Sequence, residues 1–463
     1  MVTIGLASLF ASAAFAPIAI WYLGVIGYSL FLGKLSNSSK PIIAAFTFGF
    51  LCNAIVLHWS GKFVGALPWI LLALLQALFY IPVGFVASRF KSIWWTSGAL
   101  LAMEELRSIF PFGGFGWTRI GFSQVDSPAA VILPYGGVLA LSALTLVFAL
   151  LLAKIRLPNF FKIGLIIVAL SFIPSNPQGS GSLNLLAIQG NTPSVGLGFN
   201  SRAQAVFNLH RDATYKYATD EYDAIIWPEN AIDIDPSLHP SVAVDIADLV
   251  DQTGSPLIAG VVLKRAGSPL NASVMYQSGG EVASTYIKRG LTPFGEFMPL
   301  RKIAEFVSPY ATSVIDFQKG ESLQTHRVNG SIVGPVICYE IINDRLVSEM
   351  SANSQALIVQ TNSATFAGTP ESQQQLAITR IRAIENSRSI LSVSTIGITA
   401  FIDENGAVTS QTEEDVQSAL VGDLSLNDHI TPANKWGMQL KIFILFVFLY
   451  FGFRNSRKKS GYE

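Results

Sequence analysis

The sequence predicts a bundle of about eight membrane-spanning helices with an α/β sandwich domain inserted before the last of them. Half of the 463 residues are hydrophobic and only 13% are charged, whereas about a quarter of the residues in soluble domains are charged. Long apolar runs fill the first part of the chain and return near its end. The stretch between them changes to short strand-like runs that alternate with helix-like patterns, which is typical of an α/β domain.

Changes in composition predict three segments along the chain. Residues 1–174 form a transmembrane bundle of about seven helices, residues 175–437 form the α/β domain, and residues 438–463 hold the final transmembrane helix and a basic tail. A linker rich in Ser, Pro, Gly and Asn opens the second segment. That segment is long enough to bury a sizeable core of its own.

A membrane helix needs roughly 20 apolar residues, and several runs of the chain approach or exceed that length. The uncharged run 1–33 is too long for one simple span, and Pro17 is a natural break, so we expect two short helices there. One long tilted helix is the alternative. The remaining spans are expected at 41–58, 67–88, 92–110, 128–153, 163–173 and 439–453.

Basic residues predict the orientation of this bundle. Eleven Lys or Arg residues lie in the connections on one side, and only Lys62 and Arg119 lie in the short loops on the other. Because basic loops stay in the cytoplasm, the α/β domain is expected outside it and the C-terminus inside it, which places the chain in the cell membrane. The eleven residues are Lys34, Lys40, Arg89, Lys91, Lys154, Arg156, Lys162, Arg454, Arg457, Lys458 and Lys459.

The charge balance and the counts of metal-binding residues exclude several classes of partner. Equal numbers of basic and acidic residues give zero formal net charge, so nucleic acid is not expected as a partner. Cys52 and Cys338 are too few and too differently placed for a disulfide framework or a cysteine metal site. The five histidines show no spacing that would put two ligands on one face, so no metal is expected.

Several polar residues are interpreted as structural. Glu104 and Arg107 lie three residues apart in an expected span, next to Glu105, and can form an ion pair on one helix face near the membrane surface. A contact of this pair with substrate is the less favoured interpretation. The same structural interpretation is given to Cys52, His58, Arg380 and Arg382.

Short runs rich in β-branched and apolar residues predict the strands of the α/β domain. They lie at 183–189, 224–227, 257–263, 332–338, 356–360, 390–395 and 398–402. Three- and four-residue spacing of apolar side chains predicts helices at 203–217 and 371–388. Substrates are expected at strand ends, where α/β folds usually place their chemistry.

Three charged or nucleophilic residues follow expected strands in a fixed order. Glu229 lies in the sequence WPENA, Lys288 in YIKRG with PFGE shortly after it, and Cys338 in VICYE. Lys288 follows Glu229 by 59 residues, and Cys338 follows Lys288 by 50. Taken singly, Cys338 is best explained as a small buried hydrophobe, and the two charges as structural. The ordered set favours a catalytic function.

This ordered set resembles the Glu-Lys-Cys triad of the nitrilase superfamily. A nitrilase domain inserted before a final membrane helix resembles the apolipoprotein N-acyltransferases in particular, and the resemblance covers nearly the whole chain. Further matching motifs are QGN at 189–191, KRGLTPFGEFMPL at 288–300, QQLAITRIRAIE at 374–385, GITA at 397–400, EELR at 104–107 and GFSQ at 121–124. The chain departs from the family pattern at 361–366 and at Thr395, and these departures leave the triad intact.

The resemblance implies a nitrilase-like α-β-β-α sandwich and a role for each residue. Glu229 is the base that activates the Cys338 thiol, whose ordinary pKa of about 8.5 makes it a poor nucleophile until it loses its proton. Lys288 supplies a fixed positive charge that stabilises the oxyanion of the tetrahedral intermediate. Supporting roles, which position Lys288 or handle protons, are expected for Glu296, Tyr339 and Glu340. For the two glutamates, a purely structural role is an equal alternative.

The implied reaction is ping-pong transfer of an acyl chain. Cys338 takes the chain from a membrane phospholipid as a thioester, and the α-amine of a diacylglyceryl-cysteine lipoprotein then takes it from the enzyme. A monomer that needs no cofactor is expected. Phe294, Phe297 and Met298 are expected to form a lipid-facing lip over the site, although ordinary core packing is the slightly favoured interpretation for each side chain.

Two other functions stay open. A membrane-tethered amidase with the same triad would act on a small amide without a lipid donor. A non-enzymatic scaffold or transporter would keep the fold for binding alone. Few charges lie within the expected spans and no inverted repeat is evident, which argues against transport.

Overall fold

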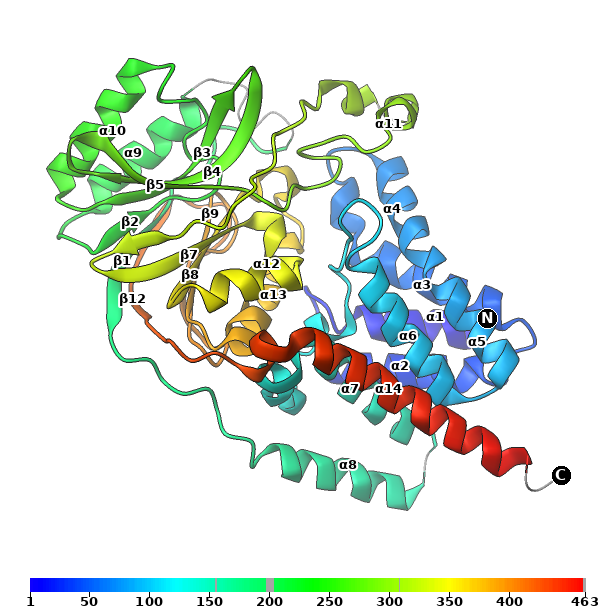
Figure 1. Cartoon of the computed structure of the whole chain (residues 1–463). Helices are drawn as coiled ribbons and strands as arrows, with labels where there is room; N and C mark the ends of the chain where they lie inside the picture. The colour runs from blue at the N-terminus through cyan, green and yellow to red at the C-terminus, as the bar shows by residue number, and fades with distance from the viewer. Residues whose placement is uncertain (155, 197–203, 308, 461–463) are drawn as a thin grey trace. The chain divides into compact units, whose positions relative to one another are not determined.

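The chain divides into two compact units in a computed structural model that describes residues 1–463 except 155, 197–203, 308 and 461–463 (Figure 1). A helical unit comprises Met1–Gly61, Gly65–Ser175 and Thr431–Glu463. An α/β unit comprises Lys62–Val64 and Asn176–Ile430. The protein therefore combines an all-helical body with a separate α/β body.

Apolar runs form the helices of the helical unit, as the sequence predicts. Its described α-helices are α1 (Val2–Ser12), α2 (Trp21–Leu35), α3 (Pro41–Val56), α4 (Ala66–Leu78), α5 (Tyr80–Phe90), α6 (Ile93–Arg107), α7 (Leu133–Leu152), α8 (Leu157–Leu170) and α14 (Pro432–Ser460). The chain is not helical between α1 and α2, so the expected break near Pro17 is present. A single long helix over 1–33 is wrong.

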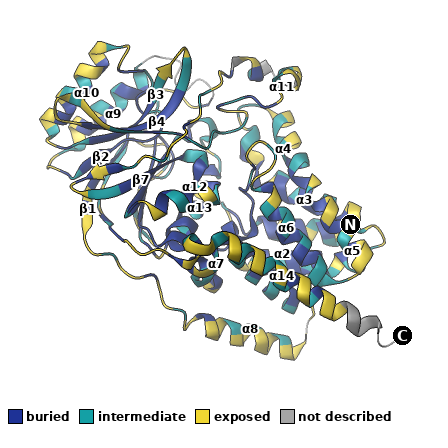
Figure 2. Ribbon diagram, viewed as in Figure 1, coloured by how far each residue is buried: buried dark blue, intermediate teal, exposed yellow. Residues whose placement is uncertain are grey.

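Three helical segments of the described chain are long and apolar enough to cross a bilayer. They are Ala66–Phe90, Pro128–Leu152 and Pro432–Asn455. Much of α8 and α14 is exposed (Figure 2), and large apolar side chains such as Phe161 and Phe446 are among the exposed ones. These features are those of a membrane protein, while the expected number of eight spans stays a prediction.

The expected ion pair between Glu104 and Arg107 is wrong, because Glu104 has partners on other elements. Its Oε2 accepts a hydrogen bond from the backbone N of Ile120 at 2.8 Å, and its Oε1 accepts one from Ser142 Oγ at 2.6 Å. Arg119 Nε lies 3.8 Å from the same carboxylate. Glu104 therefore fixes the loop after α6 against α7 instead of pairing within its own helix.

Arg107 is also buried among partners from distant parts of the helical unit. It donates to Gln76 Oε1 at 3.2 Å and to the Oγ1 and backbone O of Thr118, both at 2.6 Å. Thr118 in turn donates to Asn53 Oδ1 at 2.6 Å. Spacing along one helix can only predict local pairs. Partners of Glu104 and Arg107 come instead from the loop after α6, which folds back into the helical unit.

Two six-stranded mixed sheets form the centre of the α/β unit (Figure 1). Their strand orders are β12-β1-β2-β3-β4-β5 and β11-β10-β9-β8-β7-β6. The neighbours β1, β2 and β3 run parallel, as do β7, β8 and β9. The bounds are β1 (Ser182–Gln189), β2 (Ala224–Ile226), β3 (Leu257–Arg265), β4 (Ser268–Gln277), β5 (Glu281–Ile287), β6 (His326–Val328), β7 (Ser331–Ile337), β8 (Ala356–Thr361), β9 (Ile390–Ser394), β10 (Ala400–Ile402), β11 (Val408–Gln411) and β12 (Ser418–Ser425).

Side chains alternate along the strands between two apolar cores. In β1, Leu185 and Ala187 pack between the two sheets, whereas Leu186 packs on the other face against α9 (Ala205–Tyr217) and α10 (Pro240–Thr253). The second sheet is contacted by α12 (Asp344–Ala352) and α13 (Glu371–Asn386). The unit is therefore the predicted α-β-β-α sandwich.

The predicted strands correspond to β1, β2, β3, β7, β8, β9 and β10, and the helix predicted at 371–388 corresponds to α13. The helix predicted at 203–217 corresponds to α9, except that residue 203 lies outside the described residues. The strand expected before Lys288, whose bounds were not predicted, corresponds to β5. The sequence did not predict β4, β6, β11, β12, α10, α12 or the short helix α11 (Arg301–Val307).

Candidate active site

Cys338 lies at a sharp turn directly after β7. It begins a short 3₁₀ turn, Cys338–Ile342, and its backbone φ is +47°. This left-handed region is unfavourable for a residue with a side chain, and such residues cluster at functional sites. The surrounding contacts therefore have to hold the turn in place.

Two buried charged residues hold that turn. Glu340 Oε2 accepts a hydrogen bond from the backbone N of Ile337 at 2.9 Å. From α13, Arg382 donates to the backbone O of Ile341 at 2.8 Å and of Ile342 at 3.0 Å, and its own charge is balanced by acidic side chains. The structural interpretation of Arg382 is consistent with these contacts.

Lys288 follows β5 directly, and its side chain lies between two carboxylates. Its Nζ is 3.0 Å from Glu229 Oε1 and 2.9 Å from Glu296 Oε2. Glu229 comes from the loop after β2, and Glu296 comes from the loop after β5. All three side chains are almost fully buried. The structure therefore brings Glu229 and Lys288 together as the sequence predicts, and it adds Glu296 to them.

Asn271 on β4 links the two carboxylates, although no motif marks it in the sequence. Its Nδ2 lies 2.7 Å from Glu229 Oε1 and 2.7 Å from Glu296 Oε1. Its backbone O accepts a hydrogen bond from the backbone N of Lys288 at 2.8 Å. One buried asparagine therefore positions both acids and the lysine. A polar residue inside an otherwise apolar strand was the available signal.

The charge of Lys288 is fixed by its neighbours. Burial by itself favours the neutral amine, but the carboxylates of Glu229 and Glu296 outweigh burial and raise the pKa of Lys288 above its ordinary value. Lys288 is therefore an ammonium at any physiological pH. A buried, permanently positive group in a low-dielectric site is suited to stabilising a developing oxyanion.

The thiol of Cys338 is protonated at neutral pH. Burial raises its pKa well above the ordinary value, the charge of Glu229 raises it further, and Lys288 lowers it. The same interactions show that the sulfur lies within electrostatic range of both residues. A thiol of this kind does not react as a preformed thiolate, so it needs a base at the moment of attack.

Two family models match the chain. The apolipoprotein N-acyltransferase N-terminal domain matches residues 7–151. The carbon-nitrogen hydrolase model matches residues 187–431, which is more than half of the chain. The chain belongs to the carbon-nitrogen hydrolase family. The matched region of this carbon-nitrogen hydrolase contains Glu229, Lys288 and Cys338.

Curated relatives of this carbon-nitrogen hydrolase carry the name apolipoprotein N-acyltransferase. It is 29% identical to the apolipoprotein N-acyltransferase of Mycolicibacterium smegmatis, over 92% of this chain and 80% of the relative. It is 26% identical to the apolipoprotein N-acyltransferase of Pseudomonas syringae pv. tomato, over 91% of this chain and 90% of the relative. An amidase structure from Nesterenkonia sp. is 15% identical, with a TM-score of 0.41, over 55% of this chain and 95% of the amidase. The predicted resemblance is confirmed, and with it the prediction of an acyltransferase.

Glu340 differs from Glu296 in its contacts. Its Oε1 accepts hydrogen bonds from the backbone N of Arg289 at 2.7 Å, the backbone N of Gly290 at 2.8 Å and the hydroxyl of Tyr286 at 2.8 Å. Burial raises the pKa of Glu340, and the hydrogen bonds from Ile337, Gly290 and Tyr286 oppose that effect. Glu340 therefore ties the strand end that carries Lys288 to the turn that carries Cys338, which is a positioning role.

The residues expected to form a lip differ in exposure. Phe294 is exposed and has a positive φ, while Phe297 is half-buried. Met298 is buried in a small cluster with Ala311 and Val314, so its side chain takes part in core packing and not in an exposed lip. Tyr339 follows Cys338 in the turn, and burial raises the pKa of its phenol above the ordinary value.

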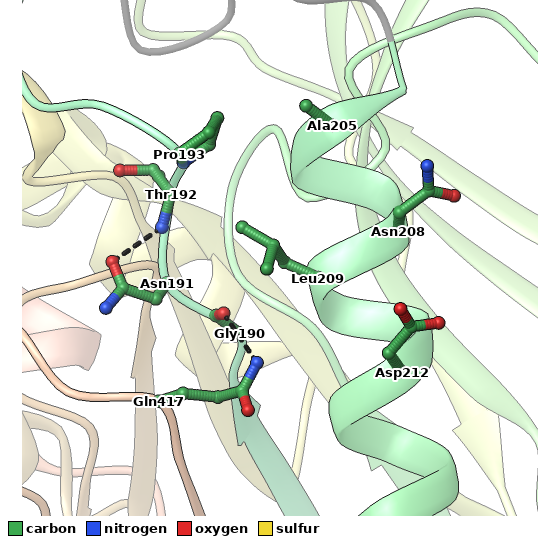
Figure 3. A pocket seen from close by; sticks show the side chains of 9 residues that line it. All are labelled: Gly190, Asn191, Thr192, Pro193, Ala205, Asn208, Leu209, Asp212 and Gln417. Atoms are coloured by element: carbon green, nitrogen blue, oxygen red, sulfur yellow. Dashed lines mark hydrogen bonds between the residues drawn. The ribbon is translucent and has the colours of Figure 1, made fainter.

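A hollow of about 490 Å³ lies beside α9 (Figure 3). The segment after β1, from Gly190 to Pro193, forms one side, and Asn208 and Asp212 of α9 lie across from it. Gln417 Nε2 donates to the backbone O of Gly190 at 3.3 Å. None of the predicted site residues lines this hollow. Among the residues that the structure describes, no group of three His, Cys, Asp or Glu side chains is placed to hold a metal ion.

Proposed function

We propose that this chain transfers an acyl chain from a membrane phospholipid to the N-terminal amine of diacylglyceryl-cysteine lipoproteins, through a thioester on Cys338. The observation that carries the proposal is a half-buried thiol within electrostatic range of a lysine held between two carboxylates, in a chain that also has membrane-length apolar helices. The names of the curated relatives support the acyl acceptor and the membrane setting.

Each step of the first half-reaction has a residue assigned to it. Glu229 takes the proton of the Cys338 thiol as the sulfur attacks the ester carbonyl of the phospholipid. The oxyanion that forms is stabilised by the ammonium of Lys288, whose position is set by Glu229 and Glu296. As the C–O bond breaks, the proton passes from Glu229 to the leaving lysophospholipid, so no net proton is released.

An exposed apolar segment of the α/β unit supports a lipid donor. Phe294, Leu300, Ile303, Phe306 and Ile315 are all exposed, and they follow Lys288 closely in the chain. Several exposed apolar side chains within one segment are typical of a surface that contacts lipid or another protein. We propose that acyl chains pass over this segment on the way to the thiol.

The orientation is proposed from the distribution of basic residues. The connections that carry Lys34, Lys91 and Arg156 face the cytoplasm, and the α/β unit lies outside it. This arrangement exposes the active site to lipoproteins after they have left the cytoplasm. In this orientation, the phospholipid donor comes from the outer leaflet of the cell membrane.

An acyl-enzyme trap tests the proposal. Purified protein is incubated with phospholipid in detergent micelles, and its intact mass and peptide masses are measured. An increase in mass by one acyl chain on Cys338 is expected in the wild type and in Cys52→Ser, but not in Cys338→Ala. Product formation without this adduct would remove the mechanism.

The same experiment separates the competing functions. Release of ammonia from small amides in the absence of any lipid would favour a membrane-tethered amidase. Full function of Cys338→Ala in cells would favour a binding scaffold. Neither outcome is expected, because a clamped lysine and a base beside a thiol serve covalent catalysis.

A further inference from the structure

Proton balance separates the two halves of the proposed reaction. In the first half, the proton lost by the thiol is returned to the leaving alkoxide. In the second half, the acceptor starts as an α-ammonium and ends as an amide, so its nitrogen loses two protons. One of them restores the Cys338 thiol when the C–S bond breaks. The other has to leave the site, and Glu229 cannot hold both.

Glu371 is a second buried carboxyl group near the thiol. It begins α13, and Gln375 lies one helical turn later, on the same face of the helix. Gln375 Nε2 is 3.8 Å from the sulfur of Cys338. The charge of Glu371 acts on the thiol of Cys338, and the charge of Glu229 acts on Glu371. Glu371 therefore lies within electrostatic range of the reacting groups.

One oxygen of this carboxyl group is buried without a hydrogen-bond partner among the described residues. That oxygen is Oε2, whereas the side chain of Glu371 is also hydrogen-bonded to Ser363. Leaving a buried carboxyl oxygen unpaired is costly, and such atoms in native structures call for an explanation. A hydrogen-bond donor on a substrate would satisfy it.

We propose that Glu371 is the second base of the reaction and accepts the extra proton from the acceptor amine before its nitrogen attacks the Cys338 thioester. This inference rests on the proposed function and deepens it. The nitrogen forms a bond to the carbonyl carbon, the C–S bond breaks, and the thiolate takes its proton through Glu229. The proton on Glu371 then passes to solvent, and Glu414, a half-buried carboxyl group that acts on Glu371, lies on the route.

The ionisation of Glu371 suits this task. Burial raises its pKa to about 8, and the charges of Glu414 and Glu229 contribute to the rise. An α-amino group has a pKa of about 7.7 to 8.0. At neutral pH a minority of Glu371 side chains are therefore ionised and able to act as a base. In that ionised form, Glu371 takes a proton from the ammonium at little cost in free energy, which is the condition for efficient general base catalysis.

Glu371→Gln tests the inference when the two halves are measured separately. Thioester formation from phospholipid is measured first, by the mass of the acyl-enzyme. Decay of the isolated thioester is then measured after addition of a synthetic diacylglyceryl-cysteine peptide. We expect Glu371→Gln to form the thioester at the wild-type rate and to lose it to the peptide about 10²-fold more slowly at neutral pH. Glu413, which is exposed and precedes Glu414 in the chain, provides the matched control. We expect Glu413→Gln to leave both rates unchanged.

A second nucleophile distinguishes proton transfer from positioning. Hydroxylamine is uncharged at neutral pH and has no ammonium proton to lose, so it should discharge the variant and the wild type equally fast. With the peptide, the difference in thioester decay rate between Glu371→Gln and the wild type should also shrink as the pH is raised above the pKa of the amine. Equal rates with the peptide, an equal deficit with hydroxylamine, or slowed thioester formation would each overturn the role of Glu371. If the wild type forms no thioester, the proposed function fails instead.

Discussion

Neighbouring carboxylates serve different purposes at the scale of single residues. Glu296 touches the lysine ammonium directly, whereas Glu340 is saturated by hydrogen bonds from the backbone and from a phenol. Both are buried glutamates next to expected site residues, so the sequence alone could not separate a structural role from a catalytic one. Their partners assign Glu296 to the charge cluster and Glu340 to the support of two loops.

Replacement of Glu340 by Gln tests this positioning role. A glutamine side chain presents an NH₂ group to donors that need an acceptor, so the turn at Cys338 and the strand end at Lys288 should shift. A displacement of this kind costs about 10²-fold in rate even far from the chemistry. We expect thioester formation, measured by acyl-enzyme mass, to fall by this factor with an unchanged pH profile. Glu349→Gln, which removes only a part-exposed contact to Arg289, is the control. A changed pH profile would instead mean that Glu340 transfers protons.

The sequence could predict the residues of the site that stand at strand ends within ordered motifs. Glu229, Lys288 and Cys338 have such contexts. Asn271 does not, because its role depends on the pairing of β4 with β5 and on a loop that returns Glu296 to the same point. Glu371 has no motif either, and its position follows from the packing of α13 and not from spacing along the chain.

The strands and helices that the sequence did not predict contain buried polar residues or mix polar and apolar residues without a regular spacing. In β4, Asn271 and Ser273 interrupt what would otherwise be an apolar run, yet both are buried because they have partners on other elements. The fully apolar β2 was predicted without difficulty. Apolar runs thus predict central strands, whereas strands with buried polar contacts need the tertiary structure to be recognised.

A buried histidine that joins the two sheets gives a pH dependence of stability. His326 on β6 lies between Ser273 on β4 and Ser284 on β5, with ring nitrogen to hydroxyl distances of 2.9 and 2.6 Å. Burial lowers its pKa from 6.5 to about 4. The unfolded chain therefore binds a proton more readily than the folded one between these values, so stability is complete above pH 6.5 and falls towards pH 4.

Thermal unfolding of the wild type and of His326→Gln in detergent measures this effect. The loss from the single group approaches roughly 3 kcal/mol over that range. His210, which is buried and has its pKa lowered to about 4 as well, contributes in the same direction. We expect His326→Gln to lose less stability on acidification than the wild type. His210 should account for part of the pH dependence of stability that the variant keeps. Parallel curves for the two proteins would contradict the assignment.

The exposed face of α11 is expected to engage lipid. Ile303→Ser and Phe306→Ser together remove two of its most exposed apolar side chains. Because a fully buried apolar side chain contributes about 1.5 to 3 kcal/mol, partial burial in lipid predicts a loss of at least about ten-fold in the rate with long-chain phospholipid. The rate with a short-chain, water-soluble acyl ester should not change. Val244→Ser, on the exposed face of α10, is the matched control. An equal loss with both donors would indicate a structural effect.

The distribution of charge over the whole molecule is the basis for its orientation. Apolar composition alone predicted where helices form, and the helices lie there, but it does not fix how many cross the bilayer. Several helices of the described chain, such as Val2–Ser12 and Leu157–Leu170, are shorter than a simple span needs. Neighbouring helices or a thinned bilayer would have to accommodate them, and such effects are not encoded in hydropathy.

Single-cysteine labelling in cells measures the orientation directly. In a Cys52→Ser, Cys338→Ser background, one exposed residue is changed to cysteine: Asp220 in the α/β unit, Lys34 in the last turn of α2, or Arg156 before α8. The layers outside the cell membrane are first made permeable while the cell membrane itself stays intact. A membrane-impermeant thiol reagent should then label Asp220→Cys. It should label Lys34→Cys and Arg156→Cys only after the cell membrane is permeabilised, because the basic connections hold them in the cytoplasm. Labelling of Arg156→Cys but not Asp220→Cys before permeabilisation would reverse the orientation and place the thiol of Cys338 on the wrong side for exported lipoproteins.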